Sequence, residues 1–203
     1  MMKKFLVAFL LLISVFGASA KFRWGPTASA NFSDYNWKQD LVRTDMRTGF
    51  NVGVMGELMI PGIGFGIDMA LRYSYRGACV HFNDQPIWND HGTGKTNLYL
   101  HTLQVPVNLR FKWTRMDGLE NIVAPLVYGG PVFNFNLGHS KCDAVDVPAG
   151  SVGLQVGGGV ELFKRYQITG GYMWDMTYDV QTKKLDNFNA RLNGGFISVA
   201  VLF

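Results

Sequence analysis

Beyond its first twenty residues the sequence has no long apolar run, so it contains no candidate for a transmembrane helix there. It also has little net charge, because its 19 basic residues, two of them in the leader described below, stand against 15 acidic ones. A nucleic-acid partner, which needs a concentrated basic face, is therefore not expected. Charged residues make up only 17% of the chain, whereas aromatic residues make up 14% and glycines number 24. This composition does not suit a solvated domain of this size.

The first twenty residues have the pattern of a secretory signal peptide. Lys3 and Lys4 precede an apolar stretch, Phe5 to Phe16, that is too short to span a bilayer comfortably. Ala18-Ser19-Ala20 matches a small-residue cleavage site, and the absence of a cysteine at the cut argues against a lipoprotein anchor. We predict a signal peptide over residues 1–20 and one domain over residues 21–203. An uncleaved N-terminal anchor is the alternative.

The clearest pattern beyond the leader lies in residues 98–113, which read LYLHTLQVPVNLRFKW. From Leu103 to Trp113 every second residue is apolar, and the residues between them are polar, charged or proline. A period of two indicates a strand with two different faces. In a soluble barrel of the lipocalin type the apolar face points inward. In a transmembrane barrel it points toward lipid, and the polar face lines the lumen.

Seven further segments have the same period. The predicted strands cover residues 22–31, 49–60, 64–75, 98–113, 122–136, 152–163, 166–178 and 191–203. The register of the fifth is undefined, because Pro125 and Pro131 interrupt its pattern. Long polar loops such as 76–97, 138–150 and 179–189 alternate with short turns such as Pro61-Gly62 and Lys164-Arg165. An even strand number and this loop asymmetry are typical of outer-membrane barrels, which have short periplasmic turns and long extracellular loops.

Aromatic residues collect at the predicted strand ends, as in the two interfacial girdles of a membrane barrel. They are Trp24, Trp113, Tyr166 and Phe203 at one end, and Tyr73, Tyr75 and Tyr178 at the other. We therefore predict an all-β fold, an eight-stranded antiparallel up-and-down transmembrane β-barrel. Its expected location is the outer membrane of a Gram-negative bacterium, with lipid around it and both termini in the periplasm.

The last strand alternates through Ile197, Val199 and Val201 and ends in Phe203. With the leader and the eight strands, it resembles a small outer-membrane barrel of the OmpX/OmpA type. More narrowly, LHTLQVPVNLRFKW and the later VGLQVGGGVELF resemble the PorT-like outer-membrane β-barrel family. The resemblance implies that the barrel-assembly machinery reads Phe203 during insertion. It also implies an alternative role in protein secretion, after the name-giving member.

Eight charged residues share the polar parity of the predicted strands. They are Arg23, Glu57, Asp68, Arg72, Arg110, Lys112, Glu161 and Asp175. Strand direction places all of them except Arg72 and Asp175 in the periplasmic half. An isolated charge in a narrow lumen is costly, whereas opposite charges can pair and form hydrogen bonds there. We predict a salt-bridged plug, with Arg110 against Glu57 or Asp68, and no continuous channel. The alternative is that each charge is hydrated separately.

Cys79 and Cys142 are the only cysteines in the sequence. The expected topology places them in the second and third extracellular loops, and the compartment permits oxidation. We predict a disulfide between them. Adjacent loops need not bring the two sulfurs together, so separate thiols are the alternative.

Two loop motifs suggest ligands without matching a known site. Gly92-Thr93-Gly94-Lys95-Thr96 ends like a phosphate-binding loop, but the full pattern requires glycine where Asn89 stands. A second group in the same loop could hold a metal, although its spacing matches no known ligand motif. Its members are Cys79, His81, Asp84, Asp90 and His91. We predict neither a cofactor nor a metal. We interpret the Gly157-Gly158-Gly159 run as room for barrel curvature.

His101 lies on the apolar parity of its strand, near the outer end. Some barrel hydrolases place a catalytic histidine on the lipid face, where it needs a serine nucleophile and an orienting acid. The residue two positions along is Leu103 rather than serine. A histidine at the level of the lipid headgroups is the simpler interpretation, so we predict no catalytic residue.

These observations favour a non-enzymatic outer-membrane barrel with a lumen filled by side chains. We expect it to bind a partner or to stiffen the membrane through its extracellular loops. The expected partners are outer-membrane lipid, the assembly machinery during insertion, and an extracellular or envelope protein. The alternatives are a component of a secretion or envelope-assembly complex and, less favoured, a lipid-modifying enzyme that uses His101.

Overall fold

The computed structural model describes residues 21–37, 43–60, 62–81, 95–114, 118–139, 145–146, 148–177, 180–182 and 189–203. The predicted signal peptide, residues 1–20, lies outside them. The long strands are β1 (Lys21–Trp37), β3 (Arg47–Met59), β4 (Phe65–His81), β5 (Lys95–Lys112), β6 (Val123–His139), β8 (Gly150–Leu162), β9 (Tyr166–Asp175) and β11 (Asn189–Val201). The short elements are β2 (Arg43–Asp45), η2 (Leu119–Asn121), β7 (Val145–Asp146) and β10 (Val180–Thr182). No helix among the described residues is long and apolar enough to cross a membrane.

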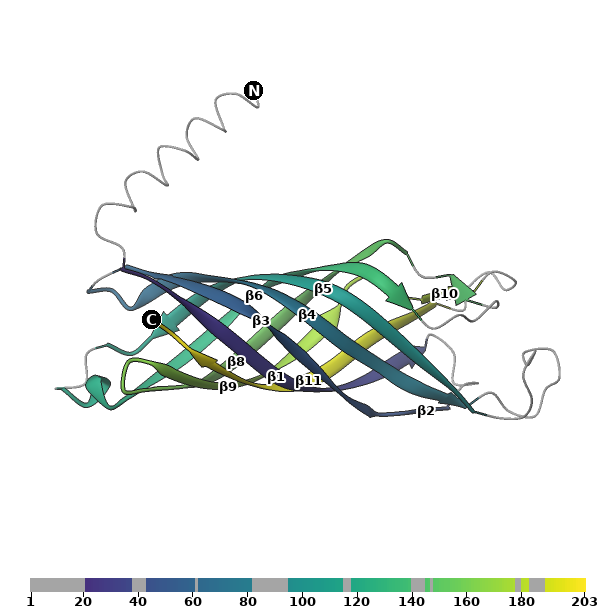
Figure 1. Cartoon of the computed structure of the whole chain (residues 1–203), viewed down its shortest axis with the longest axis horizontal. Coiled ribbons are helices and arrows are strands. Elements are labelled where there is room, and N and C mark those ends of the chain that lie inside the picture. Colours follow the sequence, from purple (N-terminus) through teal and green to yellow (C-terminus); the bar gives the residue numbers. More distant parts are fainter. Residues whose placement is uncertain are drawn as a thin grey trace, which may run out of the picture.

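The long strands form a closed antiparallel barrel, which confirms the predicted fold (Figure 1). Each long strand pairs with the next one along the chain, and β1 pairs with β11 from Thr27↔Ala200 to Trp37↔Ala190. In the described part of the chain, this closure gives every long strand a paired neighbour on both sides, which is what a bilayer requires of a β-structure.

The two ends of the barrel differ. At one end, the turn end, the backbones of Trp24 and Phe203 exchange hydrogen bonds of 3.3 and 2.9 Å. The short connections between β3 and β4 and between β8 and β9 lie there too (Figure 1). The other end, the loop end, carries β2, β7 and β10 (Figure 1). The two short strands β7 and β10 pair with each other, and β10 also pairs with β11. They lie inside segments that the sequence predicted as loops.

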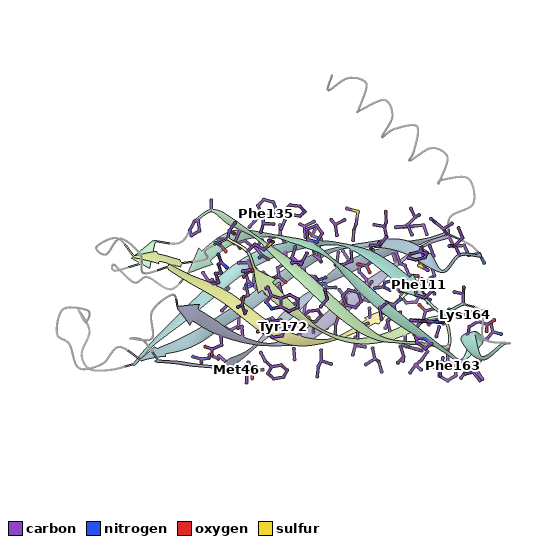
Figure 2. The ribbon with its side chains drawn as sticks, turned by 180° about the vertical axis from the view of Figure 1, so that it is seen from behind. Met46, Phe111, Phe135, Phe163, Lys164 and Tyr172 are labelled. Carbon is purple, nitrogen blue, oxygen red and sulfur yellow. The ribbon has the colours of Figure 1, made fainter. Side chains whose placement is uncertain are left out.

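The outer surface of the barrel is apolar, and on most strands the polar face points into the lumen. On β5, Leu109 is 61% exposed, whereas the next side chain, Arg110, is only 3% exposed. The same alternation holds along β4, where Ile67, Met69 and Leu71 are exposed and the intervening Asp68 and Ala70 are buried. Figure 2 shows apolar side chains such as Phe111, Phe135 and Phe163 around the outside of the barrel. This distribution agrees with a membrane barrel and excludes the lipocalin arrangement.

The strands near the loop end are longer than predicted. The sequence predicted a loop over residues 76–97, but β4 and β5 pair without interruption from Arg76↔Leu100 to His81↔Lys95. The strand predicted over 22–31 likewise continues to Trp37 as part of β1. The reason is that the backbone hydrogen bonds of a hairpin do not depend on alternating side chains. Strand pairing can therefore continue beyond the residues whose side chains alternate between apolar and polar.

The structure defines the register of β6, which the sequence left open. Its lumen-facing residues include Leu126 and Val132, each 1% exposed, and Tyr128 at 9%. Outward-facing Val127 lies between Leu126 and Tyr128, and outward-facing Phe133 follows Val132. Alternation is weak here because both faces of the strand carry apolar residues.

The turn between β8 and β9 has an unusual backbone. Phe163 and Lys164 have positive φ values of 52° and 57°. Phe163, predicted as the last residue of a strand, therefore belongs to the turn, and β8 ends at Leu162. The left-handed region is sparsely populated by residues with a side chain, and the hairpin accepts it to reverse the chain within 163–165.

Gly157 in β8 leaves space for the ring of Tyr128. A Cβ at this position would lie 2.5 Å from the Tyr128 hydroxyl oxygen and 2.6 Å from the carbonyl oxygen of Gly170. The next residue, Gly158, is less crowded, since its Cβ would lie 3.2 Å from the nearest atom, the carbonyl oxygen of Leu126. The lumen-facing Gly157 of the Gly157-Gly158-Gly159 run therefore makes room for an aromatic ring and also lets neighbouring strands approach closely.

Candidate functional site

Glu57 is the centre of a network of ion pairs across the lumen near the turn end. Its carboxylate is fully buried and accepts hydrogen bonds from Arg23 at 2.6 Å, Arg110 at 2.6 Å and Lys112 at 2.8 Å. The alternation of β3 turns Glu57 inward, and the register with β1 sets it directly opposite Arg23.

Asp68 and Arg110 form a second part of this network. The Nε atom of Arg110 donates to Asp68 at 2.7 Å while its Nη1 atom donates to Glu57. Asn108 donates to the other oxygen of Asp68 at 2.6 Å. The sequence predicted that Arg110 contacts Glu57 or Asp68; the structure joins it to both, through different nitrogen atoms of one guanidinium group.

Glu161 completes the network from β8. It accepts from Lys112 at 2.6 Å and from Arg23 at 2.7 Å. Arg23 also donates to the backbone carbonyl of Lys164 at 2.6 Å, which ties the layer to the turn between β8 and β9. We call this set of residues the charged layer. Its members are Arg23, Glu57, Asp68, Arg110, Lys112 and Glu161. It contains equal numbers of cations and carboxylates.

Gln167 is a member of this site that the sequence did not reveal. It accepts from Arg110 at 2.7 Å and donates to Glu57 at 2.7 Å and Glu161 at 2.8 Å. Its parity on β9 was available from the sequence, but an uncharged side chain carries no sign that it lies among charges. With it, the layer draws on β1, β3, β4, β5, β8 and β9.

Toward the loop end, the lumen contains an ion pair that is separate from the charged layer. Arg76 donates to Asp175 at 2.9 Å, and both side chains are almost fully buried. Asn134 donates to the other oxygen of Asp175 at 3.1 Å. Asp175 was predicted to face the lumen, whereas Arg76 fell within a predicted loop. The signal that could have found Arg76 is its even parity after Arg72 and Ser74.

Arg72, also predicted to face the lumen, lies between these two groups along β4. Its side chain is buried at 9% exposure. Within the described part of the chain it has no hydrogen-bonded partner and no ion pair, and its Nε atom is fully buried. It is therefore not part of either ion-pair cluster.

The structure also describes His101 and the end of the candidate phosphate loop. His101 accepts or donates a hydrogen bond at 2.5 Å with the Tyr73 hydroxyl, and its ring lies 5.1 Å from that of Tyr75. These neighbours are those of an aromatic girdle, and they include neither a serine nor an acid. Lys95 and Thr96, the end of the candidate phosphate loop, belong to strand β5 and not to a helix.

The cysteines and the metal candidates lie largely outside the described residues. The backbone of Cys79 belongs to β4 and not to a loop, whereas Cys142 and residues 82–94 are not described. The disulfide therefore stays a prediction. In the described ranges no group of three or more histidine, cysteine, aspartate or glutamate side chains is placed to hold a metal ion.

Comparisons with known proteins agree with this architecture. The family model described as outer membrane protein beta-barrel domain matches residues 16–200. No curated protein matches the chain in sequence.

Three solved structures illustrate the likeness in fold. The outer membrane protein OprG from Pseudomonas aeruginosa has 10% identity and a TM-score of 0.52, with 92% of this chain and 96% of that chain covered. Neisserial surface protein A has 15% identity and a TM-score of 0.48, with coverage of 91% and 99%. Ail, the attachment invasion locus protein of Yersinia pestis, has 12% identity and a TM-score of 0.46, with coverage of 90% and 99%.

The family model covers nearly all of the barrel, and its description agrees with the closed sheet and the apolar outer surface. This chain therefore belongs to the outer membrane protein β-barrel family.

Proposed function

We propose that this protein is a non-conducting outer-membrane scaffold that acts through the loop end of its barrel and not through its lumen. The observation that carries the proposal is the charged layer. Together with Gln167 it draws side chains from six of the long strands, and its ion pairs are between 2.6 and 2.8 Å long. An eight-stranded barrel is narrow enough for side chains to fill, and paired charges occupy this one.

The proposed orientation places the loop end outside the cell and both chain termini in the periplasm. What supports it is the asymmetry of the connections, because outer-membrane barrels have short periplasmic turns and long extracellular loops. Exposed aromatic residues at the turn end, such as Trp24 and Phe203, suit the inner interfacial girdle.

Conductance in planar lipid bilayers tests the closed lumen. The wild-type barrel should give no steady current. The double variant Glu57→Ala/Arg110→Ala keeps the net charge but shortens two central side chains of the layer, so we expect it to conduct. Ser151→Ala, which shortens a buried side chain away from the layer, is the matched control and should stay closed. A steady, porin-sized conductance of the wild type would contradict the proposal.

Photo-crosslinking in living cells tests which end binds a partner. Met46, 67% exposed between β2 and β3, would carry the photoreactive group at the loop end (Figure 2). Ile63, 61% exposed in the turn after β3, is the control at the turn end. Crosslinks to a protein from Met46 alone would support binding through the loop end. Crosslinks from Ile63 alone would favour the alternative role in a secretion or envelope-assembly complex.

A further inference from the structure

The lumen contains a small polar cavity between the charged layer and the Arg76–Asp175 pair. Polar side chains from six strands line it, namely β1, β3, β4, β5, β8 and β11. They include Asn31, Asn51, Arg72, Ser74, Arg76 and Gln104. Leu192 and Phe196 of β11 form an apolar wall. The cavity has room for about one or two water molecules, or for an ion of similar size.

The charges around this cavity do not balance. The charged layer is neutral in itself, and Arg76 is paired with Asp175. Among the described residues of the buried lumen, Arg72 is left as the surplus cation. The nearest carboxylate along its own strand face, Asp68, is already bound by Arg110 and Asn108. None of the described residues that line the cavity is an acid.

A buried guanidinium group without a counter-charge is costly, and the cost falls when an anion accepts its N–H groups. Arg72 lines the cavity, and its Nε–H has no acceptor in the described part of the chain. The hydroxyl of Ser74, fully buried in the same wall, also lacks a partner there. These are donors that a small anion requires.

We infer that the cavity beside Arg72 binds a small monovalent inorganic anion of the size of chloride. Arg72 supplies the charge and Ser74 a further donor, while the apolar wall from β11 strengthens the attraction by excluding water. The unpaired Oδ1 of Asn31 is an acceptor, so it takes a hydrogen from a water molecule beside the ion. The size of the cavity excludes larger organic anions.

Thermal unfolding of the full-length barrel in a non-ionic detergent tests this site, with sodium chloride compared with sodium gluconate at equal ionic strength. Binding to the folded state alone raises the midpoint by mass action. We expect a saturable rise of about 3 °C or more in chloride for the wild type. Arg72→Met, which keeps an unbranched apolar stem without the guanidinium charge, should show no such rise. Arg165→Met, at an exposed turn position, is the control and should respond like the wild type.

The variant also distinguishes an anion site from a purely structural arginine. In gluconate, Arg72→Met should be at least as stable as the wild type, because it removes an uncompensated charge. A loss of stability of equal size in both salts would overturn the inference.

Diffraction from wild-type crystals grown in sodium bromide gives a test that needs no variant. An anomalous peak next to Arg72 Nε would support the site. Its absence from the lumen would overturn it.

Discussion

Replacing Glu57 with glutamine should lower the free energy of unfolding of the barrel by about 3–5 kcal/mol, the cost of breaking a buried ion pair from one side. Glutamine has nearly the same shape, so the change removes a charge without leaving a cavity. The charge it removes faces Arg23 and Arg110, each at 2.6 Å, and Lys112 at 2.8 Å.

The magnitude follows from what remains after the substitution. Two unit charges 4 Å apart attract by about 4 kcal/mol at an effective dielectric constant of about 20, and Glu57 makes three such contacts. The loss is smaller than this sum, because each cation keeps another carboxylate partner. Glu161 still faces Arg23 and Lys112, and Asp68 still faces Arg110. Two buried cations, Arg110 and Lys112, and the partly buried Arg23 then share two carboxylates, which leaves the layer with one uncompensated positive charge.

Urea unfolding in phospholipid vesicles, followed by tryptophan fluorescence, measures this change. Glu120→Gln, a carboxylate outside the lumen in η2, is the control and should stay within about 0.5 kcal/mol of the wild type. Adding Lys112→Met to Glu57→Gln restores the balance of charge. The double variant should therefore be more stable than the sum of the two single changes predicts, by about 1–3 kcal/mol. If Glu57→Gln unfolds with the same free energy as the wild type, these charges are hydrated separately and the reasoning is wrong.

Three further outcomes are expected. The protein should stay folded in SDS without boiling and change its position on a gel after heating, because a closed barrel has no edge at which to open; partition into the soluble periplasmic fraction would contradict this. Cys79 and Cys142 should not react with maleimide in denatured, unreduced protein, and should both react after reduction. Gly157→Ala should cost about 1–3 kcal/mol in urea unfolding, since the new methyl group meets the Tyr128 ring, whereas Gly158→Ala should cost less.

The fold was largely predictable because the alternation of apolar and polar residues follows directly from strand geometry. Every second side chain of a strand points to the same face, so a polar parity such as that of Asp68, Arg110 and Glu161 identifies a shared face from the sequence alone. The pattern by itself did not say whether that face is inside or outside. Strand β6 shows another limit, because Leu126 and Val132 in the lumen erase the contrast between its faces.

The partners within the site were less predictable than its members. Parity and strand direction brought Glu57, Asp68 and Arg110 together, because they lie on neighbouring strands. The contact between Arg110 and Gln167 crosses the lumen, which requires the curvature and width of the closed barrel. Arg76 was missed because the backbone pairing of β4 and β5 continues beyond the alternating pattern.

The charged layer has a consequence for the order of assembly. Its contacts join residues far apart in the chain, such as Arg23 and Glu161, which are 138 positions apart. The contact between Arg23 of β1 and Glu161 of β8 requires a closed barrel, in which β1 has met β11. We expect it to form after the rate-limiting step, and interactions made at that stage slow unfolding without accelerating folding. This part of the layer should therefore lengthen the lifetime of the finished barrel. Until it closes, the same charges need water or an assembly partner beside them.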